Sequence, residues 1–69
     1  MAKGIPPALY ELARNHIEAD LDNNSVENGP DAVFTQAFTI AEEALLENGI
    51  DSTVARVVAH YVAMDFANP

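Results

Sequence analysis

Several features are missing from this sequence of 69 residues, and each absence excludes a class of protein. There is no cysteine, so neither disulfide bonds nor thiolate metal sites can stabilise the fold. No segment approaches the roughly 20 consecutive apolar residues of a membrane-spanning helix, and the first residues lack the apolar core of a signal peptide. We therefore expect a soluble, cytoplasmic protein with no membrane partner.

Basic residues are missing from the middle of the chain. No lysine or arginine occurs between Arg14 and Arg56, and the formal net charge is -8. Phosphate backbones and anionic lipids repel such a chain, so we expect no direct binding to nucleic acid. The acidity either only keeps the chain in solution or forms a binding surface for a basic partner. The carboxylates between the two arginines are Glu18, Asp20, Asp22, Glu27, Asp31, Glu42, Glu43, Glu47 and Asp51.

The apolar content is high for so short a chain, at 49% of residues. A chain of this length forms one domain and buries only about 60% of the surface that its unfolded form exposes. Without disulfides or metals, association with further copies is the simplest additional source of stability. We expect a single helical domain over residues 1–69 that forms a homo-oligomer.

Apolar side chains recur at helical spacing in three segments, and no segment alternates with the period of a strand. The pattern predicts helices over about residues 6–21, 31–48 and 52–67, with a polar surface loop over 22–30. The fold class is therefore all-α. We expect a small three-helix bundle, or a helical hairpin plus an N-terminal helix, completed by homodimerisation.

The predicted helix ends carry recognisable cap residues. Asp31 is expected to cap the second helix, and Gly49 is expected to end it in a left-handed conformation, followed by an apolar contact from Ile50. Either Asp51 or Ser52 can cap the third helix.

The third predicted helix is apolar around most of its circumference, so a single neighbour cannot cover it. Alanines spaced four residues apart along it allow another helix to approach closely. We expect the apolar faces of the second and third helices to form the oligomer. The residues predicted at this interface are Phe34, Phe38, Val54, Ala55, Val58, Ala59, Tyr61 and Val62.

The segment over residues 20–31 resembles the EF-hand calcium-binding pattern. Asp20, Asp22 and Asn24 stand at the first three ligand positions, Asn28 at the position that acts through water, and Asp31 at the twelfth position. The segment departs from the pattern because serine replaces the sixth-position glycine and aspartate replaces the bidentate glutamate. We therefore expect that no metal binds. Calcium binding by a helix-loop-helix module is an alternative function.

The residues Gly49, Ile50, Asp51 and Ser52 are similar to the motif at which carrier domains accept a phosphopantetheine arm on serine. That resemblance implies a truncated carrier-like protein modified at Ser52. Only 17 residues follow this serine, too few for the two further helices of such domains. A glycine that ends one helix and a polar residue that caps the next explain the same four residues.

We expect no enzymatic activity and no cofactor. His16 and His60 lie in different predicted helices, and a packed or half-buried histidine is a more common outcome than a ligand. A chain this short also leaves little volume for a substrate pocket. Arg56 either pairs with Asp51 or Glu47 or contributes to an interface, where arginine is enriched.

These observations favour a small acidic protein–protein interaction module, an inhibitor or adaptor that docks on a basic surface of another protein. One form of such docking presents carboxylates where the phosphates of a nucleic acid would lie. The residues predicted to contact the partner are Glu11, Glu18, Asp22, Glu43, Glu47 and Arg56.

Overall fold

Four helices make up the fold in the computed structural model, which describes residues 4–68. The helices are α1 (Pro7–Asp20), α2 (Asn23–Glu27), α3 (Pro30–Glu47) and α4 (Ser52–Ala67). No strand occurs within the described residues, so the predicted all-α class is confirmed. The bounds of the three long helices differ from the predicted ones by one residue or less at each end.

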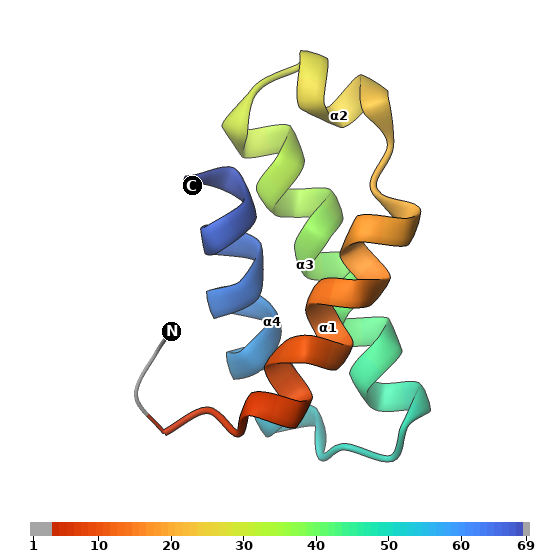
Figure 1. Cartoon of the computed structure of the whole chain (residues 1–69), viewed down its shortest axis with the longest axis vertical. Coiled ribbons are helices and arrows are strands. Elements are labelled where there is room, and N and C mark those ends of the chain that lie inside the picture. The colour runs from red at the N-terminus through yellow and green to blue at the C-terminus, as the bar shows by residue number, and fades with distance from the viewer. Residues whose placement is uncertain (1–3, 69) are drawn as a thin grey trace.

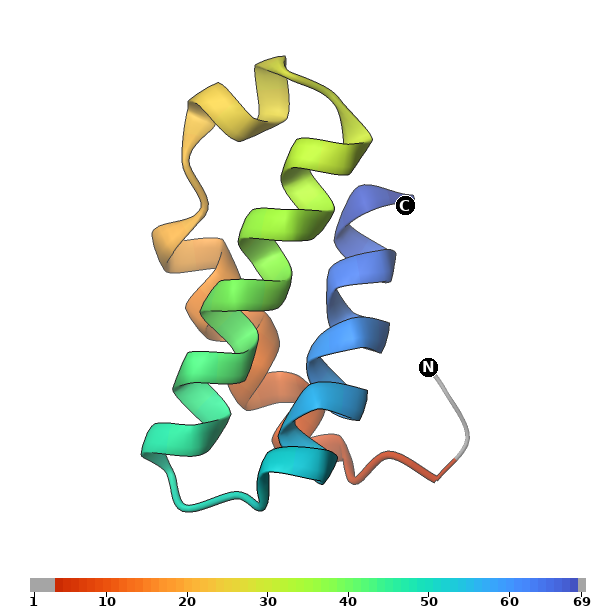
Figure 2. The same ribbon diagram turned by 180° about the vertical axis from the view of Figure 1, so that it is seen from behind.

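The helix α3 holds the fold together. Both α1 and α4 pack against α3 and also against each other, and α2 packs against α3. Figures 1 and 2 show α3 running antiparallel to α1 and α4, with the short α2 beside its N-terminal end. Each of the three long helices therefore has two long neighbours and one side that no other helix covers.

The predicted loop over residues 22–30 contains the helix α2, which the sequence pattern did not indicate. The Asp22 side chain caps this helix by accepting a hydrogen bond of 2.9 Å from the Asn24 amide. The Asp22 amide in turn donates to the Gln36 side chain on α3, at 2.9 Å. Aspartate and asparagine favour turns as well as helix caps. Their presence in this segment therefore does not distinguish a loop from a short capped helix.

The helix ends agree in part with the predicted caps. Gly49 has a φ of 80°, and Ile50 donates its amide proton to the Leu45 carbonyl at 3.1 Å, as expected for a glycine-terminated helix. Asp51 caps α4 by accepting from the Thr53 amide at 3.0 Å. The prediction that Asp31 caps α3 is wrong. Gly29 holds the cap position with a φ of 103°, and the aspartate lies in the first helical turn, where its charge is favourable to the helix dipole.

The core consists largely of alanine. The largest fully buried side chains are Ile17, Leu45, Val58 and Val62, and no polar or charged residue is buried within the described range. Because alanine keeps the helix axes close together, little space is left for larger side chains between them. The three phenylalanines, Phe34, Phe38 and Phe66, lie half-buried at the margin of the core instead. The fully buried alanines are Ala13, Ala37, Ala41, Ala55, Ala59 and Ala63.

We predict that Ala59→Gln destabilises the fold, because this alanine is fully buried and a larger polar side chain there overfills the core. Overpacking typically costs about 1–3 kcal/mol, and the buried amide group adds to that cost. Urea unfolding followed by circular dichroism measures the loss. The matched control is Ala19→Gln on the exposed side of α1, where a change below about 0.5 kcal/mol is expected. Equal free energies of unfolding for the two variants would contradict this packing.

Candidate protein interaction surfaces

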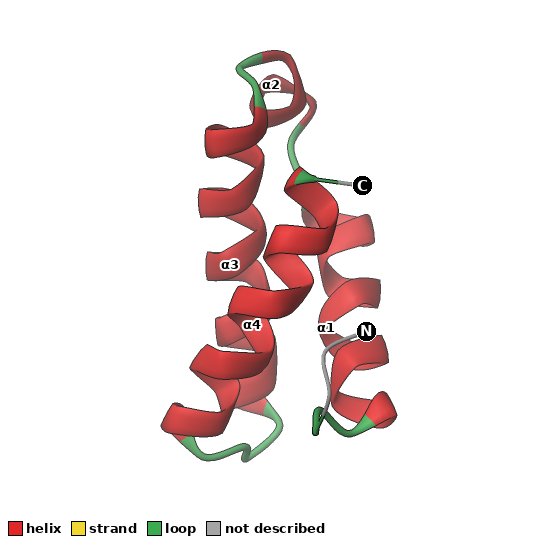
Figure 3. Ribbon diagram, turned by 90° about the vertical axis from the view of Figure 1, so that its left-hand side faces the viewer, coloured by secondary structure: helices red, strands yellow, loops and turns green. Residues whose placement is uncertain are grey.

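The outer side of α4 carries a row of exposed apolar residues. Val54, Val57, Tyr61 and Met64 are 42%, 47%, 42% and 41% exposed, and we call these four residues the α4 row. Successive members are three, four and three positions apart, so they share one face of the helix. Figure 3 shows α4 in front of α3 and α1, and both pack against the side of α4 away from the viewer. The α4 row therefore faces away from both neighbouring helices.

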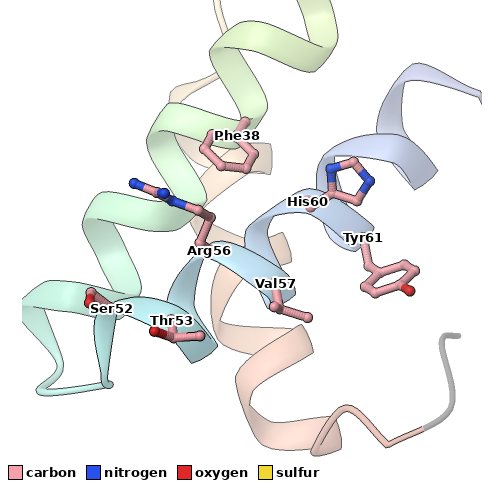
Figure 4. A pocket seen from close by; sticks show the side chains of 7 residues that line it. All are labelled: Phe38, Ser52, Thr53, Arg56, Val57, His60 and Tyr61. Atoms are coloured by element: carbon pink, nitrogen blue, oxygen red, sulfur yellow. The ribbon is translucent and has the colours of Figure 1, made fainter.

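An open hollow where α4 meets α3 includes two residues of the α4 row, Val57 and Tyr61. Phe38 contributes from α3, and the remaining lining comes from α4 (Figure 4). The His60 ring meets the Phe34 ring edge-on, with centroids 5.6 Å apart, and the Tyr61 ring at 5.7 Å. The lining residues from α4 are Ser52, Thr53, Arg56, Val57, His60 and Tyr61. The hollow thus joins the apolar row to the aromatic side chains of α3.

Arg56 stands at the margin of this hollow and pairs with Glu42, not with Asp51 or Glu47 as predicted from the sequence. The Arg56 Nε and Glu42 Oε2 atoms are 3.4 Å apart, and 76% of the arginine side chain is exposed. So exposed a pair contributes little to stability. The stretch from Ser52 to Met64 contains one arginine, one histidine and no carboxylate.

The predicted oligomer interface divides into buried and exposed parts. Four of its residues, Ala55, Val58, Ala59 and Val62, are at most 1% exposed because they pack inside the chain, so a second copy cannot contact them in this fold. Phe34 and Phe38 are half-buried against the core, while Val54 and Tyr61 belong to the α4 row. Val57 and Met64 are not among the residues predicted at the interface. The signal that could have found them is their heptad-like spacing with Val54 and Tyr61.

The predicted acidic contact residues are all exposed, but two of them also interact within the chain. Glu18 pairs with Arg14 at 3.5 Å, and Asp22 caps α2. The other carboxylates, Glu11 on α1 and both Glu43 and Glu47 on α3, form no ion pair within residues 4–68. Glu43 and Glu47 lie one turn apart and form the most closely spaced unpaired set among the predicted residues.

The five residues of the calcium pattern lie on different elements. Asp20 ends α1, Asp22 caps α2, Asn24 lies within α2, Asn28 follows α2, and Asp31 lies in the first turn of α3. Within the described part of the chain, no group of three or more histidine, aspartate or glutamate side chains is arranged to hold a metal ion.

The remaining candidate residues are surface residues. Ser52 is the first residue of α4 and is exposed, as are His16 on α1 and His60 on α4. Ser52 and His60 both line the hollow, and the lining contains no carboxylate. Across residues 4–68, none of the helices combines the length and the apolar character needed to cross a bilayer.

A hydrogen bond between α1 and α4 was not predicted from the sequence. The Tyr10 hydroxyl donates to Asp65 Oδ2, across 55 positions of the chain. This bond raises the pKa of Tyr10 above 10.0, and burial and the negative charge of Asp65 raise it further, while nearby Arg14 lowers it. No local pattern relates these two residues, so only the tertiary structure brings them together.

Comparisons with protein-family models, with curated proteins and with solved structures each found no match for this chain. The interpretation of these surfaces therefore rests on their own geometry and chemistry.

We predict that Tyr10 ionises above pH 10.0 in the folded protein. The folded state holds the phenolic proton more tightly than the unfolded chain, so this interaction stabilises the fold fully below the unfolded pKa and is lost as the pH rises through the folded pKa. In a Tyr61→Phe background, alkaline absorbance reports Tyr10 alone, because the sequence has two tyrosines. Adding Asp65→Ala should lower the midpoint toward that of the unfolded chain. An unchanged midpoint would show that the carboxylate does not hold the hydroxyl.

Proposed function

We propose that this protein is a small acidic protein–protein interaction module that acts as an inhibitor or adaptor. The observation that carries the proposal is the α4 row, four exposed apolar side chains on one face of a helix whose opposite face is buried. Single exposed apolar residues are ordinary, whereas a contiguous set is typical of an interaction site. The hollow with its aromatic and cationic lining extends this face toward α3.

The first contact we assign to the α4 row is self-association. The chain is short, has no disulfide and builds its core mainly from alanine, so burial within one copy removes relatively little apolar surface from water. Covering the α4 row with a second copy would add to this burial. We propose that the helical bundle is completed in this way as a homodimer.

The second contact is with a basic surface of another protein. The carboxylates lie outside the stretch from Ser52 to Met64, so self-association through α4 leaves them available. Glu43 and Glu47 on α3 are exposed and unpaired within the described residues. A surface of one charge sign speeds the encounter with an oppositely charged partner. Such a surface can occupy a site that otherwise receives phosphate groups.

Calcium binding and modification of Ser52 stay alternatives from the sequence. The structure adds no observation that favours either, because the calcium pattern lies on separate elements and Ser52 begins α4 next to the cap residue.

We predict that Val57→Lys abolishes self-association and leaves the helical content unchanged, because the lysine places a charge in the middle of the α4 row. Sedimentation velocity over a range of concentrations measures the association. Val26→Lys is the matched control, since Val26 is 57% exposed on α2, away from the row, and this variant should associate like the wild type. A wild type that sediments as a 7.4 kDa monomer at high micromolar concentration would refute self-association.

We also predict that a partner recovered by affinity capture binds faster at low ionic strength. The Debye length falls from about 10 Å at 0.1 M salt to about 3 Å at 1 M, so the association rate should fall over this range. Glu43→Lys with Glu47→Lys should slow association at low salt and keep the fold, because exposed substitutions usually cost below about 0.5 kcal/mol.

The control for this prediction is Asp20→Lys with Glu27→Lys, which changes the net charge equally at exposed positions near α2. If both double variants slow association by the same factor, total charge rather than the α3 carboxylates governs the encounter. If neither variant changes the rate and salt has no effect, the acidity serves only solubility.

A further inference from the structure

We infer that the α4 row is the interface of a two-fold symmetric dimer in which the α4 helices of two copies pack antiparallel. This inference rests on the proposed self-association and assigns its geometry. Two observations support a second copy as the occupant: the order of side chains along the row and the distribution of charge around it.

The spacing along the α4 row is the same in both directions, because its steps are three, four and three residues. A two-fold axis that passes between Val57 and Tyr61 therefore places the row of one copy on the row of the other. In this register, each Val57 faces Tyr61 of the second copy, and each Val54 faces Met64 of the second copy. Every contact pairs a small side chain with a large one, as close packing requires.

A parallel arrangement gives a poorer fit. There each residue faces its own equivalent, as in parallel coiled coils, so Tyr61 meets Tyr61 and Met64 meets Met64, while the two valine pairs are small. Both large pairs then lie toward one end of the row and both small pairs toward the other. The two helices could pack closely only at the valine end, so the side-chain volumes favour the antiparallel register.

The charge distribution permits two copies to meet at this face. Each copy has a net charge of -8, so most approaches bring carboxylates together and are repelled. The stretch from Ser52 to Met64 has no carboxylate and carries Arg56 and His60. The one carboxylate of α4, Asp65, follows the row and accepts the Tyr10 hydrogen bond, so α4 offers a basic partner little negative charge. A second copy, in contrast, finds an apolar row that matches its own.

The area that a stable dimer buries determines which residues the interface must include. A stable interface of ordinary size covers about 800 Å² on each partner, and the total accessible surface of this chain is 4375 Å². The α4 row is a single line of partly exposed side chains along one helix, so the antiparallel pair needs the residues at its margin as well. Phe38, Thr53 and His60 from the adjacent hollow are available for this.

Cysteine cross-linking distinguishes the two registers, and the natural chain has no cysteine to interfere. The variants are Val54→Cys and Met64→Cys, prepared separately and then mixed under a mild oxidant. In the antiparallel dimer these two positions face each other, whereas two copies of position 54 are about 15 Å apart along the helix axis, beyond the reach of a disulfide. Mass spectrometry separates the mixed dimer from the two symmetric ones.

We expect the mixed disulfide to form about tenfold faster than either symmetric disulfide, since only the mixed pair lies within disulfide geometry. Val26→Cys gives the rate of chance encounters. Symmetric disulfides that form as fast as the mixed one would overturn the antiparallel register. Rates no greater than the Val26→Cys rate would overturn the homodimer and leave the α4 row to a different protein.

A second measurement does not depend on cysteine. Val57→Lys and Tyr61→Glu should each prevent self-association, and an equimolar mixture should restore it, because the antiparallel register places the lysine of one copy against the glutamate of the other. A mixture that stays monomeric would count against this register. Self-association of the wild type should also strengthen as salt screens the repulsion between two acidic chains, and weakening with salt would contradict the proposed face.

These outcomes separate the inference from the proposed function. Binding of a basic partner that weakens with salt tests the acidic surface, and this binding does not require a dimer. If the cross-linking fails while that binding persists, the two-fold interface is refuted and the proposed binding of a basic partner is not.

Discussion

The close packing of α4 on α3 and α1 through alanine is the constraint on which the rest of the structure depends. The alanines Ala55, Ala59 and Ala63 follow one side of α4, and Ala37 and Ala41 lie on α3, all fully buried. Small side chains bring the helix axes together, which excludes larger side chains from the space between them. The valines, tyrosine and methionine of the opposite side of α4 therefore stay outside. The alanines on the buried side of α4 are thus the reason that its larger apolar residues form an exposed surface.

The sequence predicted the three long helices because their apolar spacing, proline starts and glycine end are local signals. It did not predict which side of α4 faces inward. Val54 and Val57 have the same chemistry as Val58 and Val62, so hydrophobicity alone does not show which of the two sides is buried. The alanine spacing predicts a close helix contact, and from the sequence alone a second copy is the expected partner. In the structure that contact is made within the chain, and it is the exposed side that is available to a partner.

The features that the sequence analysis missed depend on contacts between distant residues or on residues with two roles. Tyr10 and Asp65 meet only because α1 and α4 lie side by side. Asp22 was assigned to a loop and to an acidic surface, and in the structure it caps α2 and joins it to Gln36 on α3. A carboxylate that satisfies backbone amides is already used in folding. Exposure and charge alone therefore overstate the number of carboxylates available to a partner.

The acidic surface and the apolar row act in opposite directions on association between copies. Negative charge on most of the surface opposes contact, whereas the α4 row lies in a stretch, Ser52 to Met64, that has no carboxylate. A two-fold contact uses the same surface of both copies. Each row is then covered by the other, and neither is free to bind a third copy. Among residues 4–68 the other exposed large apolar residues, Val26 and Leu46, lie apart on α2 and α3, so no second apolar row extends the assembly. The proposed pairing therefore stops at two copies and leaves the carboxylates facing outward, accessible to a basic protein.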